Sequence, residues 1–126
     1  MHLHDLTIKK FHEGLVKKEF RALEVTEGYF GRIEEKNKEL NAFLSLTKDL
    51  AMRQAEAADI AIERGEAIGS LAGVPLALKD NILIEGEIAT AGSKILEHYR
   101  ASYDATVISK LRESHAVFLG KTNLDE

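Results

Sequence analysis

Leu71-Ala72-Gly73-Val74-Pro75-Leu76-Ala77-Leu78-Lys79-Asp80-Asn81 is an apolar run that ends abruptly in a lysine, an aspartate and an asparagine. An apolar run bounded by glycine and proline predicts a buried strand over Val74–Leu78. A lysine at the point where such a strand emerges can be partly desolvated, which disfavours its ammonium form and lets a neutral amine accept a proton. The alternative is that Lys79 is simply a solvated strand end.

A second apolar run follows at Ala116–Leu119 and is closed by Gly120, which predicts another buried strand. Between the two runs, apolar residues at helical spacing follow Asp104, the expected N-cap of a helix. Strand, helix and strand in this order predict a parallel unit with a right-handed crossover. Both runs are nearly continuous rather than alternating, which is typical of strands covered on both faces.

The chain before residue 66 is expected to be largely helical, with Thr7 as the N-cap of a first helix and Gly65 ending a third. The short apolar segment Ala42–Leu46 predicts a strand. We therefore expect an α/β fold in two parts. Residues 1–66 form an N-terminal helical region, and residues 67–126 form the first strands of a mixed or parallel sheet, incomplete in this chain. The helical stripes are Ile8, Phe11, His12, Leu15 and Val16; Ala22, Val25, Tyr29 and Ile33; and Ala51, Ala55, Ala58 and Ile62.

Composition excludes several classes of protein. A chain of 126 residues suffices for one modest core, and a net charge of −4 gives no basic footprint for direct nucleic-acid binding. There is no cysteine, so disulfides and thiolate metal sites are excluded, and the pair His2 and His4 has no further ligands to complete a zinc site. No apolar run approaches the roughly 18–20 residues that span a bilayer. We expect a cytoplasmic protein with no metal and no membrane partner.

Several motifs occur in order along the chain. They are Gly73-Val74-Pro75-Leu76-Ala77-Leu78-Lys79-Asp80-Asn81, Ser93-Lys94-Ile95-Leu96-Glu97, Tyr103-Asp104-Ala105-Thr106-Val107 and Leu119-Gly120-Lys121-Thr122-Asn123-Leu124-Asp125-Glu126, preceded by Asn41-Ala42-Phe43-Leu44-Ser45-Leu46. One such motif alone is weak, but an ordered set is a strong signal. In order and spacing these motifs resemble the amidase signature family. The resemblance covers nearly the whole chain, and within the family it is greatest to the A subunits of the glutamyl-tRNA(Gln)/aspartyl-tRNA(Asn) amidotransferases.

The resemblance implies an amidohydrolase with a Ser–cis-Ser–Lys triad in which Lys79 is the base. It further implies a glutaminase with subunits B and C as partners. One partner subunit uses the ammonia to amidate a mischarged aminoacyl-tRNA, and the small third subunit wraps the complex. ATP and magnesium are expected on a partner subunit, and no cofactor is expected in this chain. The family's two serines lie in Gly/Ser-rich loops beyond the segment that matches Thr122–Glu126. We therefore expect this chain to carry the lysine, to lack the nucleophile and to be inactive alone, as an N-terminal piece of the enzyme.

Four further residues are candidates for the substrate pocket. Asp80 and Asn81 follow the lysine directly and either orient it and bond the loop backbone, or simply form a turn. Thr122 and Asn123 follow the second strand, and the carboxyl ends of neighbouring parallel strands open onto the same crevice. A plain turn is the alternative there too.

Two other functions stay open. The chain either belongs to another amidase-signature hydrolase, acting on small amides, or is a non-catalytic fragment that serves only in interactions. Because the predicted sheet is short and open-edged, we also expect the chain to self-associate. Fast amide exchange is expected in Ala116–Leu119 and slower exchange in Val74–Leu78.

Overall fold

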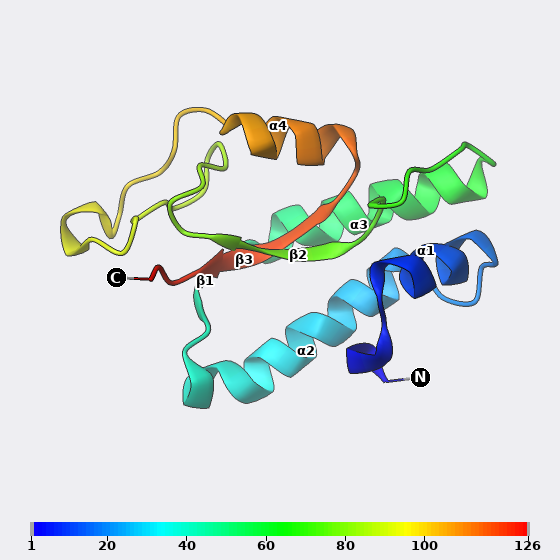
Figure 1. Cartoon of the computed structure of the whole chain (residues 1–126), viewed down its shortest axis with the longest axis horizontal. Helices are drawn as coiled ribbons and strands as arrows, with labels where there is room; N and C mark the ends of the chain where they lie inside the picture. Colours follow the sequence, from blue (N-terminus) through cyan, green and yellow to red (C-terminus); the bar gives the residue numbers. More distant parts are fainter. Residues whose placement is uncertain (1, 126) are drawn as a thin grey trace.

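The computed structural model describes residues 2–125, and within them one mixed sheet of three strands has helices on both faces (Figure 1). The strands occur in the order β1-β3-β2, so the strand that comes last in the chain is the central one. Short 3₁₀ turns lie at Leu3–Asp5 and Lys94–Leu96. The main elements are α1 (Ile8–Val16), α2 (Ala22–Leu40), β1 (Phe43–Leu46), α3 (Lys48–Glu63), β2 (Pro75–Lys79), α4 (Thr106–Glu113) and β3 (Val117–Thr122).

The helices before residue 66 form where their apolar stripes predict them. The hydroxyl of Thr7 accepts a hydrogen bond from the backbone N–H of Lys10 at 3.1 Å, which confirms Thr7 as the N-cap of α1. Helix α2 ends at Asn41 and α3 ends just before Gly65, and both residues adopt the left-handed conformation, with φ of 52° and 72°. Such residues stop a helix because they redirect the chain.

The parallel unit β2-α4-β3 is confirmed, and β1 adds to the other side of β3 in the antiparallel direction. The expectation that Gly120 closes the last strand is wrong, because β3 runs through Gly120 to Thr122. A side chain at position 120 has no room: its Cβ would lie 3.1 Å from Leu46 Cα and closer still to the carbonyl oxygen of Ser45. Glycine at this position is what allows β1 to approach β3.

Two apolar clusters pack on opposite sides of β3. One joins α1, α2 and α3 to the sheet, and the other lies beneath α4 and the loop that follows β2. Consecutive residues of β3 point to opposite faces, so that Val117 packs in the first cluster and Phe118 in the second. The first cluster contains Phe11, Leu15, Ala22, Val25, Phe30, Ile33, Ala51, Ala55, Ala58, Val74, Val117 and Leu119, and the second contains Leu78, Ile84, Ile108, Ala116 and Phe118.

Two further expectations need correction. Strand β3 is covered on both faces, but β2 is an edge strand in which Ala77 is exposed, so β2 is not doubly covered. Asp104 is not the N-cap of α4, because Ala105 occupies that position. The Asp104 carboxylate instead accepts hydrogen bonds from the backbone N–H of Glu85 at 2.8 Å and from Arg112 Nε at 2.7 Å. It therefore ties the loop after β2 to α4.

The boundary near residue 66 stays a prediction. The sheet draws on both parts of the chain, since β1 precedes that boundary and β2 and β3 follow it. Among residues 2–125, no helix combines the length and apolar character needed to cross a membrane.

Candidate active site around Lys79

Lys79 is the last residue of β2 and lies in parallel register beside Thr122, the last residue of β3. Its side chain is 40% exposed, and its Nζ lies 3.2 Å from Oδ2 of Asp125, a carboxylate that is itself largely exposed. Lys79 therefore lies at the carboxyl end of the parallel strands, where α/β proteins commonly bind their ligands. Among the described residues the side chain of Lys79 is only partly covered, and its amine is paired with the carboxylate of Asp125.

Asp80, the next residue, is fully buried and uses all of its polar groups. Its backbone N–H donates to the carbonyl of Thr122 at 2.9 Å, and its carbonyl accepts from the N–H of Ala91 at 3.2 Å. Its carboxylate accepts from the N–H of Thr90 at 3.1 Å and from the hydroxyl of Thr90 through Oδ2, while Oδ1 faces Nζ of Lys121. Asp80 thus bonds loop backbone and is more than a solvated turn residue.

Lys121 is a buried lysine that the sequence analysis missed. Its side chain is fully buried, and its Nζ lies 3.3 Å from Oδ1 of Asp80. Burial lowers the pKa of the Lys121 amine, an effect that the carboxylates of Asp80 and, more weakly, Glu87 oppose. The available signal was the absence of any polar break between the apolar run and Lys121, which places the lysine inside a strand rather than after it.

The remaining candidates are spread around the strand ends. The hydroxyl of Thr122 donates to the carbonyl of Leu78 at 3.5 Å, a long hydrogen bond within the ladder beside Lys79. Asn123 is exposed, and its Oδ1 accepts from the N–H of Leu124 at 2.9 Å. Asn81 is exposed in the turn after Asp80. The structure therefore brings Lys79 and Thr122 together, buries Asp80, and leaves Asn81 and Asn123 at the surface.

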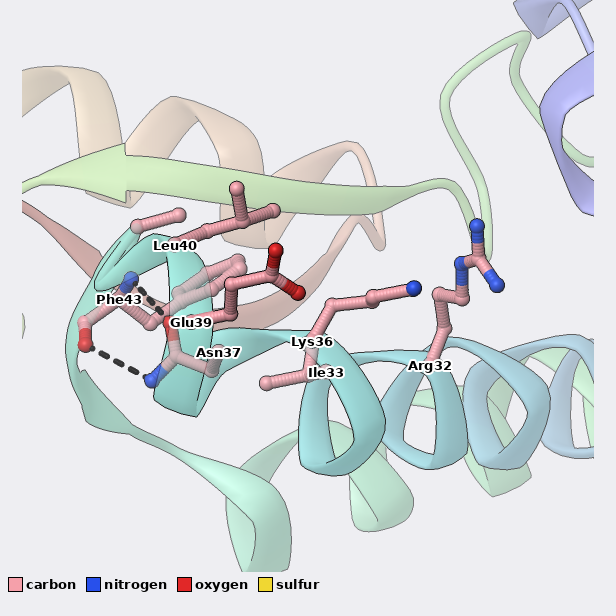
Figure 2. Close-up of a pocket in the computed structure, with 8 residues that line it drawn as sticks. Arg32, Ile33, Lys36, Asn37, Glu39, Leu40 and Phe43 are labelled. Carbon is pink, nitrogen blue, oxygen red and sulfur yellow. Dashed lines mark hydrogen bonds between the residues drawn. The ribbon is translucent and has the colours of Figure 1, made fainter.

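A hollow of about 410 Å³ lies elsewhere, between the end of α2 and the start of β1. Figure 2 shows that the side chain of Asn37 bridges to the backbone of Phe43 there, with Oδ1 accepting at 2.8 Å and Nδ2 donating at 3.1 Å. None of the site residues expected from the sequence lines this hollow. The hollow lies where Asn37 connects the end of α2 to the start of β1, and it is not part of the site around Lys79.

Comparison with known protein families gives a match over most of the chain. The family model described as Amidase matches residues 24–126. The chain therefore belongs to the amidase family.

Two curated relatives cover nearly all of this chain. It is 47% identical over 126 residues to the A subunit of the glutamyl-tRNA(Gln) amidotransferase from Carboxydothermus hydrogenoformans, covering 100% of this chain and 26% of that protein. It is 44% identical over 124 residues to the protein of the same name from Fusobacterium nucleatum, covering 98% of this chain and 26% of that protein. The chain thus spans about a quarter of the length of the curated relatives it matches.

Solved structures show the same architecture. The chain matches the native peptide amidase from Stenotrophomonas maltophilia with a TM-score of 0.88 and 34% identity, over 94% of this chain and 25% of that one. It matches a protein described in connection with the evolutionary origins of an s-triazine catabolic enzyme with a TM-score of 0.91 and 34% identity, over 96% and 27%. The α/β fold class predicted from the sequence is confirmed by these neighbours.

Proposed function

We propose that this chain supplies the lysine base of a glutamine amidohydrolase, the ammonia-producing subunit of a tRNA-dependent amidotransferase. The observation that carries the proposal is the position of Lys79 at the carboxyl end of β2, beside Thr122, in a chain of the amidase family. The names of the relatives at 44–47% identity favour an amidotransferase over other amidases. The ammonia would serve to convert Glu-tRNA(Gln) to Gln-tRNA(Gln), or Asp-tRNA(Asn) to Asn-tRNA(Asn).

In this proposal Lys79 acts as a neutral amine that receives the proton of a serine nucleophile through a second serine. Two changes must precede that role: the contact with Asp125 must be given up, and the exposed part of the side chain must be covered. A general base of this kind contributes about 10²–10⁴-fold to a rate. Thr122 lies beside Lys79 as its register partner, whereas Asp80 is buried.

The partners and location are part of the same proposal. We expect glutamine as substrate, subunits B and C as partners, aminoacyl-tRNA bound through the complex, and ATP with magnesium on a partner subunit. The cytoplasm is the expected location. Reading the coding sequence on both sides of this chain for a Gly/Ser-rich loop with two spaced serines is the quickest check.

The decisive test uses a chimera. In the Carboxydothermus hydrogenoformans relative, the matched segment is replaced by this chain, and ammonia release from glutamine is measured with the other subunits of that amidotransferase present. Lys79→Ala should lower turnover by at least about 10²-fold. Lys79→Arg should not restore it, because a guanidinium stays charged at neutral pH. Lys110→Ala, an exposed lysine on α4, is the matched control and should keep full turnover. Wild-type turnover in the arginine variant would exclude a neutral-amine base.

A second candidate is an amidase acting on small or peptide amides, because the solved neighbour from Stenotrophomonas maltophilia is a peptide amidase. It would use the same lysine. The two functions separate by substrate: the amidotransferase hypothesis predicts that the chimera prefers glutamine to peptide amides, and the reverse preference would favour the second candidate.

A further inference from the structure

The buried pair of Asp80 and Lys121 lies directly beneath the proposed base. Both side chains are essentially fully buried, at 1% and 0% exposure, and they face each other at 3.3 Å. Removing two charges from water is costly, so a buried pair is retained only where its geometry is well satisfied or where it serves a purpose. Here one carboxylate oxygen is occupied by Lys121 and the other by the N–H and hydroxyl of Thr90.

The strand register places Lys121 and Lys79 on opposite faces of the sheet. Lys79 is the register partner of Thr122, and Lys121 is the partner of Leu78, one position earlier. Neighbouring residues of a strand point to opposite faces, so Lys79 and Lys121 leave the sheet on opposite faces. Leu78 belongs to the cluster beneath α4, and Lys121 is therefore on that covered face.

Asp80 joins the two faces through the backbone. It is bonded to Lys79 by a peptide link, and its own N–H and carbonyl are held by Thr122 and Ala91. The charged groups around this arrangement are Asp125 on Lys79, from the segment after β3, and Glu87 towards Lys121, from the loop after β2. Asp80 thus carries a buried carboxylate on the residue that follows Lys79, and Lys121 is its paired cation.

Resting on the proposed function of Lys79, we infer that Asp80, clamped by Lys121 and Thr90, is the positioning residue of that base. Lys121 has two tasks in this arrangement. It holds the carboxylate in place, and it cancels the negative charge that would otherwise stabilise the ammonium form of Lys79 across the sheet. In this arrangement Lys79 can act as a neutral amine only when Lys121 is present.

The test follows the titration of the Lys79 amine by NMR in this chain carrying ¹³C-labelled lysine, with the signal assigned by its loss in Lys79→Arg. Lys121→Gln removes the cation and keeps a donor towards Asp80. The inference predicts that the titration midpoint of Lys79 rises by roughly half to one pH unit. The double variant Lys121→Met/Asp80→Asn has neither charge, and its midpoint should return to the wild-type value.

Lys48→Met is the matched control, because Lys48 forms a surface ion pair with Glu34 at 3.4 Å, far from β2 in the chain. Its removal should leave the midpoint of Lys79 unchanged. If the midpoint is also unchanged in Lys121→Gln, or if the double variant keeps the shift, the inference is overturned and the pair is structural only. This readout needs no catalysis, so it is independent of whether Lys79→Ala inactivates the chimera.

A second variant covers the case in which Lys121→Gln does not fold. Thr90→Val removes one donor to Asp80 without changing any charge, and Thr90→Ser keeps it. In the chimera, Thr90→Val should lower kcat by roughly tenfold with KM unchanged, as expected for a misplaced base, and Thr90→Ser should restore kcat. An unaltered kcat in Thr90→Val, with Lys79→Ala inactive in the same chimera, would overturn the positioning role while leaving the proposed function intact.

Discussion

The carboxylate of Asp59, near the end of α3, accepts the backbone N–H of Ala22, the first residue of α2, at 2.7 Å. Its second oxygen accepts the N–H of Leu23 at 3.0 Å, and Arg21 Nε lies 3.7 Å away. The first N–H groups of a helix have no partner within the helix, and a carboxylate there also meets the positive end of the helix dipole. One helix thus provides the N-terminal cap of another.

Asp59→Ala should therefore lower the free energy of unfolding by about 1–3 kcal/mol, since one buried and one partly buried donor lose their acceptor. Urea unfolding followed by circular dichroism measures the change. Glu56→Ala, an exposed residue one turn earlier on α3, is the control and should stay within about 0.5 kcal/mol of wild type. Equal stability of the two variants would mean that the cap contributes nothing.

Gly120→Ala tests the close approach of β1 to β3. The added methyl would meet Ser45 and Leu46, so β1 must move away, at a cost of about 1–3 kcal/mol. Hydrogen exchange should show faster opening of the amides in β1. Gly31→Ala on α2, where the methyl would contact nothing within 4 Å, should instead stabilise the chain by up to about 1 kcal/mol. A stabilised Gly120→Ala variant would contradict the packing described for β3.

Asp104 should make stability sensitive to acid. Burial raises the pKa of its carboxyl, but the backbone N–H of Glu85 and the guanidinium of Arg112 outweigh this effect, so the pKa lies below its ordinary value of 3.8. A lowered folded-state pKa gives stability that is present above pH 3.8 and is lost as the pH falls through the folded-state value.

The corresponding variant is Asp104→Asn, which should cost on the order of 1 kcal/mol at pH 7 and progressively less below pH 4. Urea unfolding across this range measures the difference between variant and wild type. Glu66→Gln, an exposed residue that follows α3, is the control and should show no such pH dependence. A difference for Asp104→Asn that persists at the lowest pH would exclude the proposed ionic contribution.

Amide exchange should be slower in Val117–Thr122 than in Pro75–Lys79. The opposite order was expected from the sequence, but the sheet order argues against it. Strand β3 bonds to a neighbour on each side, whereas β2 has one open edge. Exchange measured by NMR or mass spectrometry would contradict the topology if β2 were the better protected strand.

Local patterns predicted most of the local structure. The helices before residue 66, the N-cap at Thr7 and the strand predicted over Val74–Leu78 all depend on near neighbours, and they are confirmed, with the strand shifted by one residue to Pro75–Lys79. The first apolar stripe is only partly buried, because Ile8 and Val16 are exposed. Features that depend on distant partners were missed. Gly120 resembles a strand terminator until β1 is placed beside it, and Asp104 resembles an N-cap until Arg112 and Glu85 are near.

The same contrast between near neighbours and distant partners applies to the candidate site. Lys79 and its neighbour Thr122 were predicted because parallel strand ends converge on one crevice. The burial of Asp80 was not, since its partners Thr90 and Lys121 come from a loop and a strand well separated in the chain. The sequence signal for Lys121, an apolar run with no polar break before it, places the lysine within a strand but does not identify the carboxylate that pairs with it.

The central position of β3 has a consequence for synthesis on the ribosome. Strands β1 and β2 emerge first, yet they do not pair with each other, and each awaits a partner that is made after both. At roughly 5–20 residues per second, β2 has an unsatisfied edge for a few seconds before β3 is complete. The contacts of Asp59 with Ala22 and Leu23 join α3 to α2 and can form before β3 is made. The apolar cluster of these helices is completed only later, when Val117 and Leu119 of β3 pack against it.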